Sequence, residues 1–168
     1  IPEGWVAQYI RFPGKQALEK QFVKKMKNWL DPESVFLIVR DQDAGDCRDI
    51  KGHLLELCKE TGRRHYLVRI ACRELESFYC GDLDAVAAAF DMPRVATMKG
   101  KKRFRDPDSM QNPKQELRVL TGNLYQPLIG SRLIASHMRI QINRSRSFHH
   151  LIDGIRRLTE NQHWCRIP

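Results

Sequence analysis

Two aspartates, Asp41 and Asp43, lie in the charged segment 40–43 that ends the apolar run 35–39, and they are the first candidates for chemistry in this chain. Five consecutive apolar residues, three of them β-branched, predict a short strand that is buried on both faces. Residues two apart in an extended chain point to the same side, so both carboxylates would face one point. Carboxylates held together repel each other, and a hard cation such as Mg²⁺ offsets that repulsion. The spacing therefore indicates a magnesium site, with a solvated turn as the alternative, because Asp is also common after strands.

A second acidic pair, Glu74 and Glu76, follows segment 65–72, which predicts another strand. Ligands of open α/β sheets bind beyond the carboxyl ends of the strands, so we expect one or both glutamates to join the aspartates. All four carboxylates are thus candidate metal ligands and catalytic residues. The alternative is structural, because acidic residues in a first helical turn favour the helix dipole. In a helix the two glutamates point about 200° apart, so both reach one ion only if extended geometry persists through Glu76.

Basic side chains near these acids are candidates for stabilising phosphate charge. Lys51 lies about one turn into the helix predicted after Asp46, and Arg73 immediately precedes Glu74. A long segment, 91–113, lacks any periodic pattern and is predicted to be a mobile basic loop. Its positive residues are expected either to bind a phosphate backbone or to be simply solvated. They are Lys99, Lys101, Lys102, Arg103 and Arg105. His53 and His137 are either proton relays or ordinary histidines.

Composition limits the class of protein. The 168 residues suit one domain with a hydrophobic core, and no apolar run approaches the roughly 18 residues that span a bilayer. The net charge of +9 suggests an anionic partner, most plausibly nucleic acid, with a merely basic surface as the alternative. We expect no signal peptide, and the five cysteines form no C-x-x-C pair. We therefore expect reduced thiols in a cytoplasmic protein without a membrane or zinc site.

Hydrophobic periodicity predicts an α/β fold with a largely parallel central sheet flanked by helices and a helical C-terminal third. Strand 35–39 is expected to be central, between strands near Trp5 and Tyr66. The elements expected in chain order are a strand 5–12, a helix 16–30, the strand 35–39, a helix 47–61, the strand 65–72, a helix from 73 to about 90, the loop 91–113, and helices 114–120, 129–140 and 147–158.

The chain resembles the DUF4276 family of Toprim-like proteins. The resemblance spans about Phe12 to Leu158 and rests on four blocks: Asp41-Gln42-Asp43 with Asp46-Cys47 and Lys51, Arg69 to Asp82, Ser131 to Met138, and Ser145 to Phe148. It implies a Toprim-like fold and a partner ATPase of the AAA or ABC type, because family members are often encoded beside ATPases of phage-defence nucleases. The chain departs from the Toprim pattern at one point. Toprim domains have a glutamate at the end of an earlier, first strand, and no such strand and glutamate precede Trp5 here. Glu3 is a poor substitute, so we expect either a preceding N-terminal strand or a protein that lacks this acid.

The first reading is therefore a Toprim-like nuclease, or a remnant of one, that uses Mg²⁺ or Mn²⁺ to hydrolyse nucleic acid phosphodiesters. Asp41 and Asp43 would bind the metal, and Glu74 or Glu76 would complete its shell. The main alternative is a module without turnover that binds nucleic acid or a partner ATPase. A small-molecule phosphotransfer enzyme is a third possibility, which the basic segment 91–113 disfavours.

Overall fold

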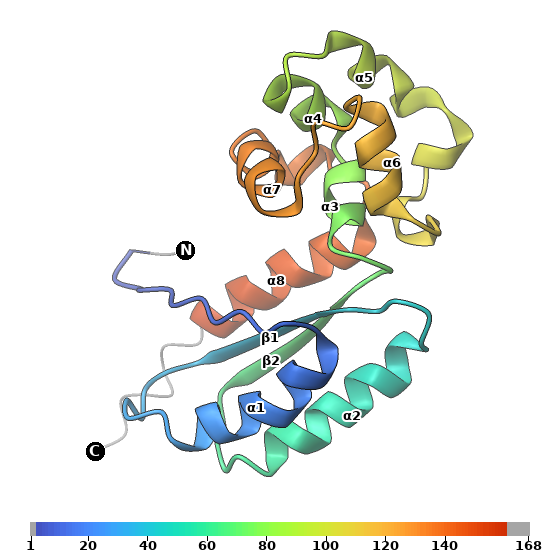
Figure 1. Cartoon of the computed structure of the whole chain (residues 1–168). Coiled ribbons are helices and arrows are strands. Elements are labelled where there is room, and N and C mark those ends of the chain that lie inside the picture. Colours follow the sequence, from blue (N-terminus) through green and yellow to red (C-terminus); the bar gives the residue numbers. More distant parts are fainter. Residues whose placement is uncertain (1–2, 161–168) are drawn as a thin grey trace.

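Two parallel strands with helices on both faces form the first part of the fold, the lower half of Figure 1. The computed structural model describes residues 3–160. β1 (Phe36–Asp41) pairs with β2 (Tyr66–Ala71) in a register from Phe36↔Tyr66 to Asp41↔Ala71. α1 (Lys15–Lys27) and α2 (Cys47–Lys59) cover one face of this pair, and α8 (Arg146–Glu160) lies along the other. The α/β character and the parallel pairing expected from the sequence are confirmed.

Apolar spacing and helix caps explain these elements. Phe22 and Met26 stand four residues apart on α1 and are both buried, which is the helical period facing a core. Asp46 caps α2, because its Oδ1 accepts hydrogen bonds from the backbone N–H groups of Arg48 (2.7 Å) and Asp49 (3.2 Å). The core between these helices and the sheet contains Phe22, Met26, Ile38, Leu54, Cys58, Val68 and Ile70.

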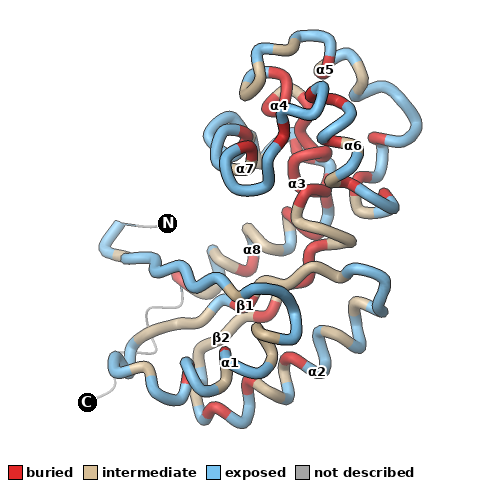
Figure 2. The backbone as a smooth tube through the Cα atoms, in the orientation of Figure 1, coloured by how far each residue is buried: buried red, intermediate tan, exposed pale blue. Residues whose placement is uncertain are grey.

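The second part of the fold is helical and lies in the upper half of Figure 1. Its α-helices are α3 (Glu76–Cys80), α4 (Leu83–Ala89), α5 (Pro93–Thr97), α6 (Pro113–Leu120) and α7 (Pro127–Ala135). Single 3₁₀ turns form η1 (Met98–Gly100), η2 (Lys102–Phe104), η3 (Pro107–Ser109) and η4 (Ile140–Ile142). A separate core fills this part, and Figure 2 shows its buried backbone; Val86, Val95, Phe104, Leu117, Tyr125 and Ile134 belong to it.

A small apolar cluster and the start of α8 join the two parts. Ala71 at the end of β2 packs with Phe78 of α3 and Phe148 of α8, and the two rings lie 5.5 Å apart. Asp108 then fixes the first turn of α8. Its Oδ1 accepts a hydrogen bond from the Ser145 hydroxyl (2.6 Å), and its Oδ2 accepts one from the Ser147 backbone N–H (2.8 Å). α8 therefore connects the helical core to the face of the sheet opposite α1 and α2.

The predicted strand 5–12 is wrong, and so is the central position of β1. Residues 5–12 are irregular and make no backbone hydrogen bond to β1; the side chains of Val6 and Tyr9 are 87% and 84% exposed. The alternating pattern produces a strand only where it pairs with an edge and packs on a surface, and most side chains of this segment are exposed and none of its backbone groups bonds the unpaired edge of β1. Within residues 3–160, β1 therefore pairs on one edge only, and the sheet has two strands.

Two further expectations for the region after β2 are wrong. The single helix predicted from residue 73 to 90 is interrupted at Gly81–Asp82, where Asp82 accepts a hydrogen bond from the Ala85 backbone N–H (3.1 Å) and begins α4. Segment 91–113 is a chain of short helical turns instead of a loop, because Phe104, Pro107 and Met110 are buried in the helical core. No helix in residues 3–160 combines the length and apolar character that crossing a membrane requires.

Candidate functional site

The ends of β1 and β2 bring the predicted acidic residues to one edge of the sheet. Asp41 is the last residue of β1, and its Oδ1 accepts a hydrogen bond from the Leu75 backbone N–H (2.8 Å). Beyond the strands, the backbone N–H of Asp43 donates to the carbonyl of Arg73 (2.9 Å). One side-chain and one main-chain hydrogen bond therefore join the two acidic segments, as the parallel arrangement of the strands predicts.

Asp41 is held in an environment that disfavours its negative charge. The pKa of this carboxyl group is raised from its ordinary 3.8 to about 6, mainly by burial and also by the negative charges of Glu76, Asp43 and Glu74, against the opposing hydrogen bond from Leu75. A charge that is disfavoured by burial and by three other carboxylates is a charge that a cation would stabilise.

Asp43 adopts a different geometry from the one the sequence suggested. Its φ of 56° lies in the left-handed region, so the extended chain that would align it with Asp41 ends before it. The carboxylate is exposed and forms an ion pair with Lys15, the first residue of α1, at 3.1 Å between Oδ2 and Nζ. Lys15 therefore supplies a positive charge beside Asp43, although the two residues are 28 positions apart in the sequence.

Glu74 and Glu76 both accept hydrogen bonds from the helical part. Oε2 of Glu74 accepts one from the Lys114 backbone N–H in the first turn of α6 (3.1 Å). Glu76 is only 7% exposed, and its Oε1 accepts a hydrogen bond from the Tyr125 hydroxyl (3.0 Å). The helical part thus holds two of the four predicted carboxylates in place.

These four side chains have the chemistry of a magnesium site but do not assemble one in this arrangement. Oxygen ligands and excess negative charge are what Mg²⁺ requires. Among residues 3–160, however, no group of three or more His, Cys, Asp or Glu side chains is placed to hold a metal ion. Asp43, Glu74 and Glu76 each direct an oxygen at a protein donor instead. The shared cation stays a prediction, and it requires these carboxylates to turn toward Asp41.

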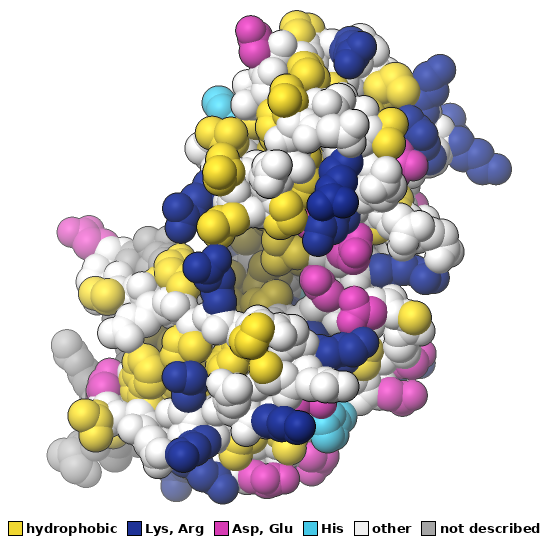
Figure 3. All heavy atoms as spheres, viewed as in Figure 1, with side chains coloured by type: hydrophobic (Ala, Val, Ile, Leu, Met, Phe, Trp, Pro, Cys, Tyr) yellow, Lys and Arg dark blue, Asp and Glu magenta, His cyan; other side chains and the backbone are white. Residues whose placement is uncertain are grey.

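A groove runs from the acidic residues along the unpaired edge of β1. It has a volume of about 1720 Å³ and is lined by residues 4–12 and 33–41, together with Lys15 and Asp43. Figure 3 shows hydrophobic side chains in the hollow between the two parts of the molecule, with basic and acidic side chains at its margins. Asp41 and Asp43 therefore open onto a surface large enough for an extended ligand.

The predicted basic residues are spread over several elements. Lys51 is exposed on α2, and Arg73 is half-buried after β2. In the segment 98–105, Lys99 pairs with Asp84 (3.1 Å), and Arg103 pairs with Glu116 (3.2 Å). The exposed side chains of that segment also include Lys101, Lys102 and Arg105. The histidines lie elsewhere: His53 is 3.7 Å from Glu19, and His137 is exposed after α7.

Sequence reasoning missed the residues that position the acids. Tyr125 and Lys114 contact Glu76 and Glu74 across separations of 49 and 40 residues, and no local pattern marks either of them. Lys15 had only the signal of a lysine beside Gly14 at a helix start. Arg40, which forms a mostly buried ion pair with Glu19 (2.6 Å), had no signal because it follows directly on the apolar run.

Comparisons of the chain with protein-family models, with curated proteins and with solved structures find no match. The resemblance to the DUF4276 family therefore stays a prediction that rests on the motifs quoted above.

Proposed function

We propose that this protein is a Toprim-like, Mg²⁺- or Mn²⁺-dependent nuclease, or a component of one, that acts on nucleic acid phosphodiesters. The observation that supports this function is Asp41, whose buried charge is disfavoured by three other carboxylates at the end of a parallel strand. The adjoining groove and the net charge of +9 fit a long anionic substrate.

In this proposal each group has a defined role. Asp41 and Asp43 bind the metal, with Glu74 or Glu76 completing its shell, and Lys15 lies beside them for phosphate charge. A bound divalent ion polarises the phosphate and stabilises the leaving oxygen. Lys51 and Arg73 are the further candidates for charge stabilisation. Among residues 3–160 there is no obvious general acid or base at this site. In Toprim domains the glutamate of an earlier strand fills that role.

The second candidate is a module without turnover that binds nucleic acid or a partner ATPase. It is favoured by one observation: all four carboxylates already accept a hydrogen bond or an ion pair from a protein donor without a cation. Under this alternative the acidic cluster is structural and the basic surface of the helical part carries the function.

A nuclease assay paired with thermal melting separates the two. We expect the wild type to cleave DNA or RNA and to melt at higher temperature with Mg²⁺, because a ligand at about 100 times its Kd stabilises the folded state by about 2.7 kcal/mol. Asp41→Asn and Asp43→Asn should lose both effects, since Asn removes the negative charge that holds a hard cation. Asp153→Asn is the matched control, because Asp153 is an exposed aspartate on α8. A wild type that neither cleaves nor gains melting temperature overturns the nuclease and leaves the binding module.

Nucleic acid binding by the segment 98–105 has its own test. Each neutralised phosphate contributes about −0.9 to the slope of log affinity against log salt on duplex DNA. Replacing Lys101, Lys102 and Arg103 by Ala should flatten that slope, whereas Ala at the exposed α1 lysines Lys20, Lys24 and Lys27 should not. Arg103 should contribute least, because its guanidinium already pairs with Glu116. An unchanged slope would place the binding surface elsewhere.

A further inference from the structure

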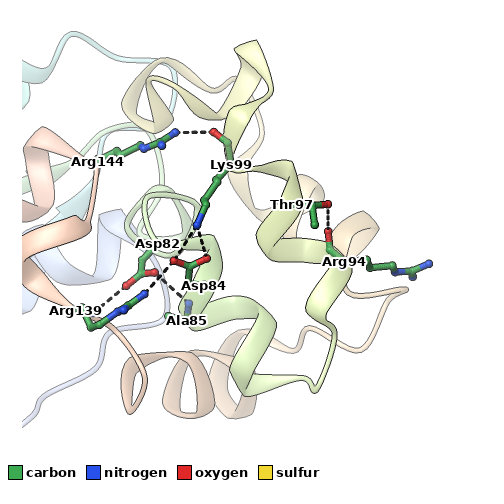
Figure 4. A network of polar contacts seen from close by, with 8 residues as sticks. All are labelled: Asp82, Asp84, Ala85, Arg94, Thr97, Lys99, Arg139 and Arg144. Atoms are coloured by element: carbon green, nitrogen blue, oxygen red, sulfur yellow. Dashed lines mark hydrogen bonds and ion pairs between the residues drawn. The ribbon is translucent and has the colours of Figure 1, made fainter.

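Positive side chains from three separate segments lie near the start of α4: two meet at Asp84, and the third contacts the backbone of Lys99 (Figure 4). Lys99 comes from η1, Arg139 precedes η4, and Arg144 precedes α8. The carboxylate of Asp84 accepts hydrogen bonds from both Lys99 Nζ (3.1 Å) and Arg139 Nη2 (3.0 Å). Arg144 donates from Nη1 to the backbone carbonyl of Lys99 (2.6 Å). Lys99 and Arg139 therefore share one carboxylate, and Arg144 lies against the backbone of Lys99.

Backbone contacts fix two of these segments against the junction of α3 and α4. The backbone N–H of Arg144 donates to the Gly81 carbonyl (3.0 Å), and that of Arg139 donates to Asp82 Oδ2 (2.9 Å). Asn143 packs so closely on Gly81 that a Cβ there would collide with its Oδ1. Asn143 also donates from Nδ2 to the Phe78 carbonyl (2.8 Å). The positions of the cations are therefore set before any ligand arrives, which lowers the entropy lost on binding.

The charges around Asp84 do not balance. Asp82 is 2% exposed and accepts bonds from two backbone N–H groups, so Asp84 is the carboxylate that faces Lys99 and Arg139. Arg144 uses a neutral carbonyl as its partner, and no carboxylate among residues 3–160 lies within ion-pair distance of it. The cluster therefore carries excess positive charge and unused guanidinium donors, the groups that bind phosphate in a forked geometry.

A cavity lies at this cluster. It has a volume of about 190 Å³ and is lined by Asp82, Asp84, Lys99 and Arg144 among others, whereas Arg139 lies outside the lining, on the far side of its contact with Asp84. Roughly 10–15 Å³ of such space is enough for one water molecule, so a phosphate group fits. The side chains of Lys99 and Arg139 are both 55% exposed, which leaves the cluster open to a polymer that passes over the surface.

We propose that Lys99, Arg139 and Arg144 form a binding site for a phosphate group of a nucleic acid backbone. Asp84 occupies the place of the anion in the free protein and holds two of the cations together. This site rests on the nucleic acid binding that belongs to the proposed function, but it requires neither metal nor cleavage. It extends the contact surface from the segment 98–105 to residues that no sequence pattern marked as basic ligands.

Two substitutions of opposite expected sign test the site. Binding of fluorescein-labelled duplex and single-stranded DNA is measured by anisotropy in EDTA across a salt series, so that no cleavage intervenes. Arg144→Gln should weaken binding about 8-fold at 0.1 M salt and reduce the salt slope by about 0.9, the loss of one phosphate contact. Asp84→Asn should tighten binding several-fold, because it removes the competing carboxylate. Arg156→Gln is the control, because Arg156 is an exposed arginine on α8.

The outcomes are distinct. Opposite effects of the two substitutions, with partial recovery in Arg144→Lys and unchanged circular dichroism, support the site. Weaker binding by both variants indicates a structural role and overturns it, as does an unchanged affinity in Arg144→Gln. Inorganic phosphate that shifts the Arg144 side-chain resonances without any DNA binding by the wild type also overturns the nucleic acid site. Because the measurements are made without metal, failure of the nuclease assay does not affect this test.

Discussion

Replacing Asp41 by Asn should stabilise the metal-free protein. The environment raises the pKa of Asp41 from 3.8 to about 6, and one unit of pKa corresponds to about 1.36 kcal/mol. Ionised Asp41 thus destabilises the fold by up to about 3 kcal/mol at neutral pH, and by about 1–3 kcal/mol once partial exposure to solvent is considered. Asn keeps an oxygen that accepts the Leu75 backbone N–H and removes the charge.

The gain should depend on pH in a defined direction. The folded pKa of Asp41 lies above the unfolded value, so the unfolded chain loses its proton first as pH rises. The contribution of Asp41 to stability is therefore retained below about pH 3.8 and is lost between there and about pH 6. At pH 4 the wild type and Asp41→Asn should have nearly equal free energies of unfolding, and at pH 7.5 the variant should be more stable.

Urea unfolding at both pH values, in EDTA, measures this difference, with an unchanged m-value as the check that the unfolding transition is comparable. Asp43→Asn is the matched control. Its carboxylate is exposed and paired with Lys15, so the change should be within about 1 kcal/mol and destabilising. A variant Asp41→Asn that is no more stable than wild type at pH 7.5 would refute the argument that Asp41 lacks a compensating cation.

Three further substitutions test the packing around the site. Gly81→Ala should destabilise by about 1–3 kcal/mol, measured by urea unfolding, because its Cβ collides with Asn143; Gly100→Ala, with open space around it, should change little. Leu117→Ala should lower the free energy of unfolding by about 2–5 kcal/mol, since this side chain is fully buried in the helical core. Tyr125→Phe should destabilise by about 1.5–3 kcal/mol and shift the Glu76 carboxyl resonance in ¹³C NMR, because Glu76 loses its hydroxyl donor; neither effect would appear if water replaced that donor.

Much of the α/β part could be predicted because its signals are local. The pair Phe22 and Met26 shows the helical period of α1, Asp46 marks the start of α2, and the uninterrupted apolar run gives β1. The meeting of the strand ends also follows from parallel pairing, and with it the nearness of Asp41 to the segment that bears Glu74 and Glu76.

The remainder depends on contacts between residues far apart in sequence. Nothing within Glu74 to Glu76 shows that Lys114 and Tyr125 will donate hydrogen bonds to these carboxylates. Phe104 lies among charged residues, so the local sequence does not indicate its burial, which results from contacts with the rest of the helical core. Residues 5–12 are the opposite case: their alternation is a local signal for a strand, but they form no backbone hydrogen bonds with the unpaired edge of β1.

The separation of the two hydrophobic cores gives the acidic residues an unusual position in the folding of the chain. Asp41 ends a strand of the α/β part, whereas the groups that hold Glu74 and Glu76 belong to the helical part, and the small cluster of Ala71, Phe78 and Phe148 joins the two parts together with the start of α8. Cores that are joined so narrowly form separate cooperative units, which open with different free energies. Hydrogen exchange should therefore protect β1 and α6 to different extents. Opening of the helical unit would release both glutamates and change the electrostatic field at Asp41. The pKa of Asp41 therefore depends on whether the helical unit is folded.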